Sequence, residues 1–170
     1  ICFLMLLAGL DTVTASLGCT VAYLASNPSQ REKLIGEPQL LDGMVEELLR
    51  WETPVTGVPR VLAKDPTLHD QVLKKGEMVT ILLGASNLDE GEFERPGEVE
   101  FARERNRHLS FGAGPHRCLG SHLARMEMRV ALEEWHRRIP AYAVAPGETP
   151  QYSSGIREVL YLPLVWPRSS

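Results

Sequence analysis

Cys118 is the residue of this chain with the clearest capacity for chemistry, because of the loop that presents it. The loop reads FGAGPHRCLG and runs from residue 111 to residue 120. Gly112, Gly114 and Pro115 prevent a regular element from running through it, so the backbone must turn tightly or admit another group closely. A cysteine thiolate attacks electrophiles or binds metals, whereas an isolated cysteine often packs as a small hydrophobe. Taken alone, the residue leaves both interpretations open.

The residues after the loop are expected to form a helix, which would place Cys118 at the helix N-terminus. This helical pattern ends at Pro140. Its apolar stripe recurs at helical spacing and consists of Leu119, Leu123, Met126 and Val130. Unpaired backbone N–H groups and the positive end of the helix dipole favour the thiolate form of a cysteine at such a position.

Asp11 and Thr12 are a second candidate site, because they interrupt an apolar segment at residues 1–26. A membrane span would place Asp11 near its middle at a cost of about 2.5–3.5 kcal/mol, so we expect a buried helix of a water-soluble protein. Gly9 costs about 1 kcal/mol relative to alanine in a helix, and a buried acid without partners costs more. These costs favour a functional reason. The alternative is a helix kink in which Thr12 bonds to a carbonyl one turn earlier.

Composition limits the classes of protein to which the chain can belong. Its 170 residues are 44% hydrophobic, which suffices for a single domain with a core. A net charge of −4 without a long basic run argues against a nucleic-acid partner. The cysteines, Cys2, Cys19 and Cys118, are odd in number and lack metal-type spacing, so no disulfide framework is expected. A reducing compartment, the cytoplasm, is expected instead.

The remaining segments alternate between helical and strand-like patterns. Helices are expected at residues 29–34 and 40–51, and antiparallel strands between residues 53 and 84. An irregular segment at residues 87–107 leads to the cysteine loop, and a hairpin at residues 155–166 follows the last helix. The expected fold class is mainly α with small antiparallel β-sheets (α+β).

The loop around Cys118 matches the pattern Phe-Gly-x-Gly-x-His-x-Cys-x-Gly at every fixed position, and in this it resembles the haem-binding signature of the cytochrome P450 superfamily. The runs GLDTV, EELLR, LKKG and LPLVW are similar to those of its soluble bacterial group. The resemblance implies the C-terminal portion of the P450 fold, a single partial domain over residues 1–170. The helical pattern already present at Ile1 agrees with a portion that is incomplete at its N-terminus.

The resemblance implies a cofactor, haem b, and assigns residues to it. Cys118 would ligate the iron as a thiolate, which donates more electron density to iron than neutral imidazole does. His116 and Arg60 would bind the haem propionates, since a guanidinium group matches a carboxylate in bidentate fashion. Further cofactor contacts are implied for Phe111, Gly112, Leu119, Gly120, Ala8 and Gly9.

The resemblance also assigns residues around the cofactor. Asp11 and Thr12 would relay protons to the reduced oxygen. Glu47 and Arg50 share a helix face and could form an ordinary surface ion pair, but the resemblance implies a buried structural triad with Arg103. The implied substrate lining is mostly apolar, which suggests a hydrophobic substrate. It consists of Val55, Thr56, Gly57 and, from the C-terminal hairpin, Ile156.

The implied function is that of a haem-thiolate monooxygenase, which inserts one oxygen atom from dioxygen into a small, mainly hydrophobic organic substrate. Electrons would come from NAD(P)H through a reductase and a ferredoxin or flavodoxin-like carrier. An acidic carrier would dock on a positive face of the protein. Arg117 is the main candidate for this face, and the other candidates are Arg105, Arg107, Arg125 and Arg129.

Two alternatives stay open. The chain could bind haem without turnover, because the part of the fold that covers the substrate side would be absent. It could also be a small zinc-binding module that uses His116, Cys118 and His122, although a structural zinc site needs a fourth ligand.

Overall fold

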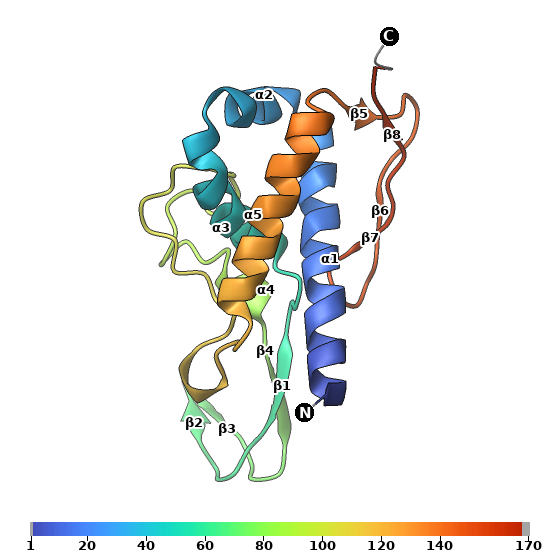
Figure 1. Cartoon of the computed structure of the whole chain (residues 1–170). Helices are drawn as coiled ribbons and strands as arrows, with labels where there is room; N and C mark the ends of the chain where they lie inside the picture. Colours follow the sequence, from blue (N-terminus) through green and yellow to red (C-terminus); the bar gives the residue numbers. More distant parts are fainter. Residues whose placement is uncertain (1, 168–170) are drawn as a thin grey trace.

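The long helix α1 (Cys2–Ser26) is the element along which the other helices pack. The computed structural model describes residues 2–167, with side chains from residue 8 onward, so Ile1 and the side chain of Cys2 lie outside the described part. Figure 1 shows α1 and α5 (Ser121–Arg138) side by side along the length of the molecule. The helix α3 (Leu41–Glu52) packs against both of them.

The shorter helices connect these three elements. They are α2 (Pro28–Gly36), α4 (Leu83–Ser86) and two short 3₁₀ helices, η1 (Pro38–Leu40) and η2 (Gly114–His116). Prolines at the first positions of α2 and η1 explain where these helices start, since proline lacks the N–H that the first turn leaves unpaired. The expected helices at residues 29–34 and 40–51 therefore correspond to α2 and α3.

The strands form four separate two-stranded antiparallel sheets. The pairs are β1 (Val58–Val61) with β4 (Met78–Ile81), β2 (Thr67–Leu68) with β3 (Gln71–Val72), β5 (Ala143–Val144) with β8 (Leu164–Val165), and β6 (Gln151–Tyr152) with β7 (Val159–Tyr161). Residues 161–166, expected to return from the C-terminal hairpin, contain the end of β7 and all of β8. Figure 1 shows β6 and β7 along one side of α1 and the β1–β4 sheet below α4.

The hydrophobic core lies where α1, α2, α3 and α5 meet. Leu24, Met44 and Leu48 are at most 1% exposed, and Met128 and Leu132 of α5 pack in the same cluster. Burying a side chain of this size stabilises a fold by about 1.5–3 kcal/mol. The core therefore fixes α3 between α1 and α5, and α3 in turn positions the segments that follow it.

Residues 8–11 of α1 are exposed, so the expectation of a buried helix was wrong for this part of it. Among the residues whose side chains are described, Ala15 is the first buried one. Asp11 therefore reaches solvent and does not carry the cost of a buried acid. The Thr12 hydroxyl donates a hydrogen bond to the carbonyl of Ala8 at 2.9 Å, while α1 continues as one helix. Over the described residues, no helix is long and apolar enough to cross a membrane.

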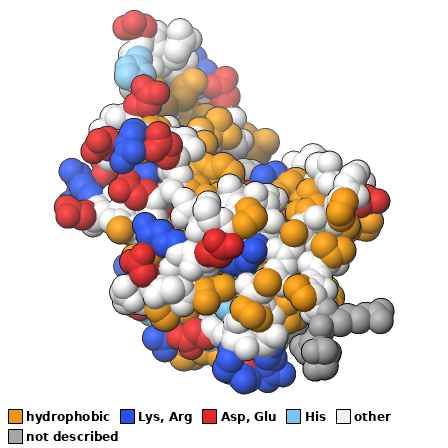
Figure 2. All heavy atoms as spheres, turned by 90° about the horizontal axis from the view of Figure 1, so that it is seen from above, with side chains coloured by type: hydrophobic (Ala, Val, Ile, Leu, Met, Phe, Trp, Pro, Cys, Tyr) orange, Lys and Arg blue, Asp and Glu red, His pale blue; other side chains and the backbone are white. Residues whose placement is uncertain are grey.

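The apolar stripe predicted on α5 does not face the core. Leu123, Met126 and Val130 are about half exposed, at 53%, 54% and 48%, whereas Met128 and Leu132 on another face are buried. The helical period was correct, but a second apolar row at positions 128 and 132 packs against α3 and α1. Figure 2 shows that hydrophobic side chains also reach the surface on the face seen from above.

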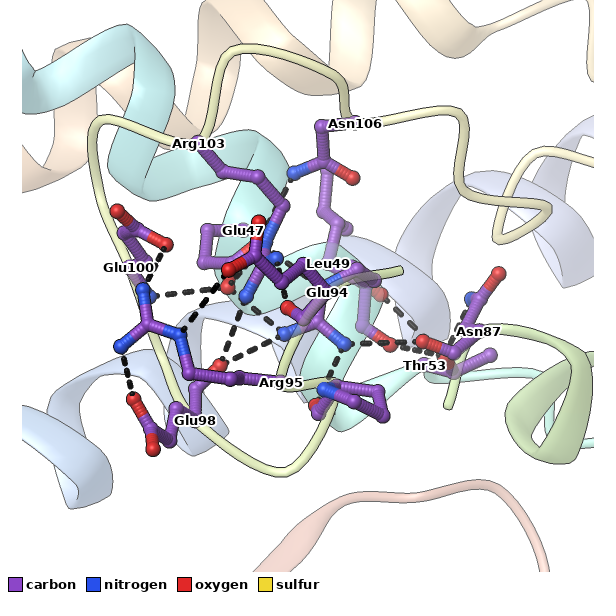
Figure 3. Close-up of polar contacts among 12 residues, drawn as sticks. Glu47, Leu49, Thr53, Asn87, Glu94, Arg95, Glu98, Glu100, Arg103 and Asn106 are labelled. Atoms are coloured by element: carbon purple, nitrogen blue, oxygen red, sulfur yellow. Dashed lines mark hydrogen bonds and ion pairs between the residues drawn. The ribbon is translucent and has the colours of Figure 1, made fainter. Parts of the chain in front are cut away.

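A buried carboxylate on α3 anchors the irregular segment that leads to the cysteine loop (Figure 3). Glu47 is fully buried, and its two oxygens accept hydrogen bonds from Arg50 at 2.9 and 2.7 Å. Arg103 donates to the same carboxylate at 3.0 Å, and the backbone N–H of Glu100 donates to it at 2.9 Å. Asn106 adds a side-chain bond at 3.0 Å. One carboxylate thus joins α3 to residues on both sides of a turn.

Arg50 extends this network to the backbone. It is fully buried and donates to the carbonyls of Asn87, Pro96 and Glu98 at 2.9, 2.8 and 3.0 Å. An ion pair of this kind needs hydrogen bonds to its remaining N–H groups, because burial removes the solvation of both charges. The backbones also meet here, since an added Cβ at Gly43 would overlap the carbonyl oxygen of residue 101. The segment is therefore fixed to α3 by charge, hydrogen bonds and shape.

The substitution Glu47→Gln should lower the free energy of unfolding by about 3–5 kcal/mol, because Arg50 and Arg103 then stay buried without their counter-charge. Urea denaturation measures this as a lower midpoint at an unchanged m-value. Glu134→Gln is the matched control, since Glu134 pairs with arginines on the exposed face of α5 and such pairs contribute little. Equal midpoints for the two variants would contradict the anchoring role of Glu47.

Stability should also fall in acid because of Glu47. Burial by itself raises the pKa of Glu47, but hydrogen bonds from Arg50 and from the Glu100 amide outweigh it and hold the pKa below its ordinary value of 4.5. Such a group contributes stability that is complete above the unfolded-state pKa and is lost as the pH falls through the folded-state pKa. The urea midpoint should therefore decrease below pH 4.5. The decrease should be smaller in Glu47→Gln, and an unchanged pH slope would assign the acid sensitivity to other groups.

Candidate functional site

A cavity of about 460 Å³ lies between α1, the β1–β4 sheet and the loop that presents Cys118. Its size is in the range of small-molecule and cofactor sites. The wall from α1 consists of Ala8, Gly9, Thr12, Val13 and Ser16. The wall from the cysteine loop includes Phe111, Gly112, His116, Cys118 and Gly120. Pro54, Val55, Val58 and Arg60 belong to the segment that enters β1 and form a third side.

One backbone hydrogen bond closes the cysteine loop. The N–H of Cys118 donates to the carbonyl of Phe111 at 2.8 Å. Gly112 and Gly114 have φ angles of +66° and +63°, a left-handed conformation that favours glycine. The Cys118 side chain is exposed and lines the cavity. The alternative of a buried, hydrophobe-like cysteine therefore does not apply to this residue.

The helix after the loop begins later than expected. α5 starts at Ser121, so Cys118 precedes the first turn, and Gly120 is the N-cap residue. The Ser121 N–H donates to the Cys118 carbonyl at 3.4 Å, which still couples the loop to the helix. Leu119 is 98% exposed and does not belong to the cavity lining, although a cofactor contact was expected for it.

The α1 wall contains the small residues and the hydroxyl expected there. An added Cβ at Gly9 would meet no atom within 4 Å, so the helix surface is open towards the cavity at this position. Thr12 lines the cavity and Asp11, its neighbour, does not. The structure therefore places the hydroxyl at the site and the carboxylate at the solvent-exposed surface beside it.

Two nitrogen-containing side chains border the cavity from different elements. Arg60 comes from β1 and is exposed, and its Nη1 donates to the carbonyl of Pro59 at 2.8 Å. His116 comes from the end of η2 and is also exposed. A flat apolar group that carries carboxylates at its edge would find donors on both sides.

These residues fit a haem group. The cavity wall is mostly apolar, which suits the macrocycle, and its one thiol is a known type of axial ligand for haem iron. Arg60 and His116 supply N–H donors of the kind that bind carboxylates such as the propionates. The glycines of the loop and of α1 keep side chains out of the space between the two walls.

Only Val55 of the expected substrate lining is brought to this cavity. Thr56 is exposed, and an added Cβ at Gly57 would lie 3.0 Å from the methyl group of Thr80, on the strand side. Ile156 lies in the turn between β6 and β7, outside the lining. Residues 55–57 lie in an irregular stretch between α3 and β1, so no regular alternation directs their side chains to one face.

Ser16 and Pro54 are among the lining residues that were not predicted. Ser16 follows Thr12 by four residues on α1, so helical spacing alone would have identified it. Pro54 precedes Val55 and carries no sequence signal of its own. Its position is set by contacts with the C-terminal hairpin, where the Arg157 N–H donates to the Pro54 carbonyl at 2.9 Å.

The arginines predicted as a positive face differ in their surroundings. Arg117 is exposed, as expected, whereas Arg105 lies 3.3 Å from Glu92. Arg125 is partly buried and pairs with Glu46 of α3. For the zinc alternative, no three His, Cys, Asp or Glu side chains between residues 8 and 167 gather closely enough to hold a metal ion.

The chain is similar to bacterial cytochromes P450 along most of its length. It is 43% identical over 147 residues to the probable cytochrome P450 127A1 of Sinorhizobium fredii, which covers 86% of this chain and 35% of the relative. It is 38% identical over 168 residues to the mycinamicin IV hydroxylase/epoxidase of Micromonospora griseorubida, with 95% and 42% covered. A solved post-tailoring hydroxylase involved in himastatin biosynthesis superposes with a TM-score of 0.92 at 35% identity, with 97% and 45% covered.

The chain thus spans less than half the length of these relatives, between 35% and 45%. The TM-score confirms the expected fold, mainly α with small antiparallel sheets. The family model described as cytochrome P450 matches residues 1–138, a range that contains both α1 and the cysteine loop. The chain belongs to the cytochrome P450 family.

Proposed function

We propose that this chain is the haem-binding part of a monooxygenase and that Cys118 is the axial thiolate ligand of haem b. The observation that carries the proposal is the exposed thiol of Cys118 in the wall of a mostly apolar cavity, together with the glycine-rich loop that holds it. Family membership supports the cofactor and the reaction class. When bound, the haem iron supplies the activation of dioxygen for transfer of one oxygen atom to a substrate.

The protein residues have separate tasks in this proposal. The Phe111 carbonyl and the tight loop hold the Cys118 backbone, so the sulfur is presented to the cavity at a fixed place. Arg60 and His116 would hold the propionates and thereby orient the bound group. Ala8 and Gly9 are small residues in the α1 wall of the cavity, where larger side chains would obstruct a diatomic ligand.

Proton delivery is assigned to Thr12 and Asp11. The Thr12 hydroxyl lies in the cavity wall and donates to the Ala8 carbonyl, so its oxygen lone pairs are free to accept a proton donor from the cavity. Asp11 is exposed and adjacent to Thr12 in the sequence. In the proposed relay the Thr12 hydroxyl would release the Ala8 carbonyl, donate its proton into the pocket and take a replacement proton from water or from Asp11, while the apolar pocket excludes bulk water.

The proposed substrate is small and mainly hydrophobic, because Val13, Val55 and Val58 line the cavity. The proposed electron source is NAD(P)H through a reductase and a ferredoxin or flavodoxin-like carrier, with Arg117 on the docking face. The proposed compartment is the cytoplasm, which supplies NAD(P)H and keeps cysteine thiols reduced.

The axial-ligand assignment predicts a spectroscopic signature. After reconstitution with haemin, reduction and addition of carbon monoxide, the chain should show the red-shifted Soret band of a thiolate-ligated haem. Cys118→Ala should lose this band. Cys19→Ala is the matched control, because Cys19 is buried and burial raises the pKa of its thiol to about 12, so it does not form a thiolate. A red-shifted band that persists in Cys118→Ala would refute the assignment.

The proton-delivery assignment predicts that, without Thr12, more of the electrons from NADPH end in hydrogen peroxide. In the haem-loaded chain supplied with NADPH, a reductase and a ferredoxin, Thr12→Ala should raise the hydrogen peroxide formed towards one molecule per NADPH consumed. Thr14→Ala is the control, because Thr14 makes the same type of bond, to the Leu10 carbonyl at 2.9 Å, but does not line the cavity. An equal peroxide yield in both variants would remove Thr12 from the mechanism.

A further inference from the structure

A second carboxylate of α3, Glu46, holds two side chains on the far side of the cysteine loop. Arg125 of α5 donates through Nε to one carboxylate oxygen and through Nη2 to the other, the latter at 2.8 Å. The Nε2 atom of His108 lies 3.0 Å from the same carboxylate. Because Nδ1 of His108 accepts the Ser110 N–H at 3.3 Å, Nε2 carries the proton and donates to Glu46.

The two side chains that Glu46 holds both contact the ring of Phe111. The Arg125 guanidinium carbon lies 4.4 Å from the ring centroid, within the range of a cation–π interaction. The His108 and Phe111 ring centroids are 5.8 Å apart. The carbonyl of Phe111 is the acceptor of the Cys118 N–H. An unbroken series of contacts therefore runs from Glu46 through Phe111 to the backbone of Cys118.

The pKa of Glu46 agrees with its hydrogen bonds to Arg125 and His108. Burial by itself raises the pKa of Glu46, but the hydrogen bonds from Arg125 and His108 outweigh it and lower the pKa to about 2. The carboxylate is therefore charged at neutral pH and holds the Arg125 guanidinium by charge as well as by hydrogen bonds. The side chains of Arg125 and Glu46 are only 28% and 29% exposed. A paired, stacked arginine of this kind is not a free surface charge.

We propose that Glu46 and Arg125 are positioning residues for the Cys118 sulfur and that they act through the ring and the carbonyl of Phe111. This inference rests on the proposed role of Cys118 as the haem ligand. It also reassigns Arg125, which the sequence had placed among the residues of an electron-carrier docking face. The planar fork of arginine is required, because it binds both oxygens of Glu46 and stacks on an aromatic ring at once, and lysine can do neither in the same way.

Loss of the contacts from Glu46 and Arg125 to Phe111 should loosen the cysteine loop, although Cys118 itself remains in the chain. When the Phe111 ring loses these contacts, its residue and the carbonyl it carries are held less firmly, so the Cys118 N–H and sulfur would be less fixed in position. Removal of a group that orients a metal ligand typically lowers the affinity for the metal by about 10–100-fold. A docking residue, by contrast, changes the encounter with a carrier and leaves the isolated haem protein unaltered.

The test compares Arg125→Gln, Arg125→Lys and Glu46→Gln in the haemin-reconstituted chain, with no electron carrier present. We measure the fraction of the reduced carbon monoxide complex in the red-shifted thiolate band and the equilibrium affinity for haemin. All three variants should show a smaller thiolate fraction and an affinity lower on the order of 10-fold. Arg138→Gln, on the exposed end of α5, is the matched control and should equal the wild type.

The double variant Glu46→Gln/Arg125→Gln should be no worse than the poorer single variant, because both residues act through one contact. The urea midpoint is measured alongside, and if Arg125→Gln does not fold, Arg125→Lys keeps the charge and tests the same contact. Wild-type thiolate fractions and affinities in folded Arg125→Lys and Glu46→Gln would overturn the inference. A wild-type chain that shows no thiolate band would instead overturn the proposed function.

Discussion

The structure depends first on the buried charge of Glu47. Three groups besides Arg50 donate to its carboxylate, namely the Glu100 N–H, Arg103 and Asn106, and Arg50 itself donates to the carbonyls of Pro96 and Glu98, so residues 96–106 are fixed against α3. Without a fixed segment the cysteine loop would have no defined starting point, because regular structure is absent between α4 and η2. The hydrophobic core holds the helices together, but this ion pair determines where the loop that follows it begins.

Two adjacent carboxylates divide the support of the site between them. Glu46 and Glu47 lie about 100° apart around α3, since a helix has 3.6 residues per turn. Glu47 faces the irregular segment, and Glu46 faces Arg125 of α5 and His108. Glu47 fixes the segment that leads into the cysteine loop. Glu46 fixes the side of the loop that carries the Phe111 ring. A single helix that the core holds rigid thereby positions both flanks of a loop that has little regular structure of its own.

The sequence predicted those parts of the site that depend on local chemistry. Glycines at positions 112 and 114 predicted a tight turn or a close approach of another group, and both glycines have left-handed φ angles in the structure. The exposed faces of α1 and α5 were not predictable, because periodicity reveals that a helix has an apolar stripe but not which neighbour covers it. Likewise, Thr56 and Ile156 were assigned to a cavity by the family resemblance, whereas Thr56 lies in an exposed irregular stretch before β1 and Ile156 in the turn between β6 and β7, both outside the lining. The pairing of Arg125 was not predictable, because its partner lies 79 residues away in the sequence.

The separation of the strands into four pairs has a consequence for how this chain meets its surroundings. Each described strand has one hydrogen-bonded neighbour, so each leaves a row of backbone N–H and C=O groups open at its other edge. Val61 and Met78 face each other across the β1–β4 pair and are 69% and 71% exposed. Open edges beside apolar side chains are the places where a sheet accepts another strand. The β1–β4 pair therefore presents exposed apolar side chains beside strand edges that have no second hydrogen-bonded neighbour among the described strands.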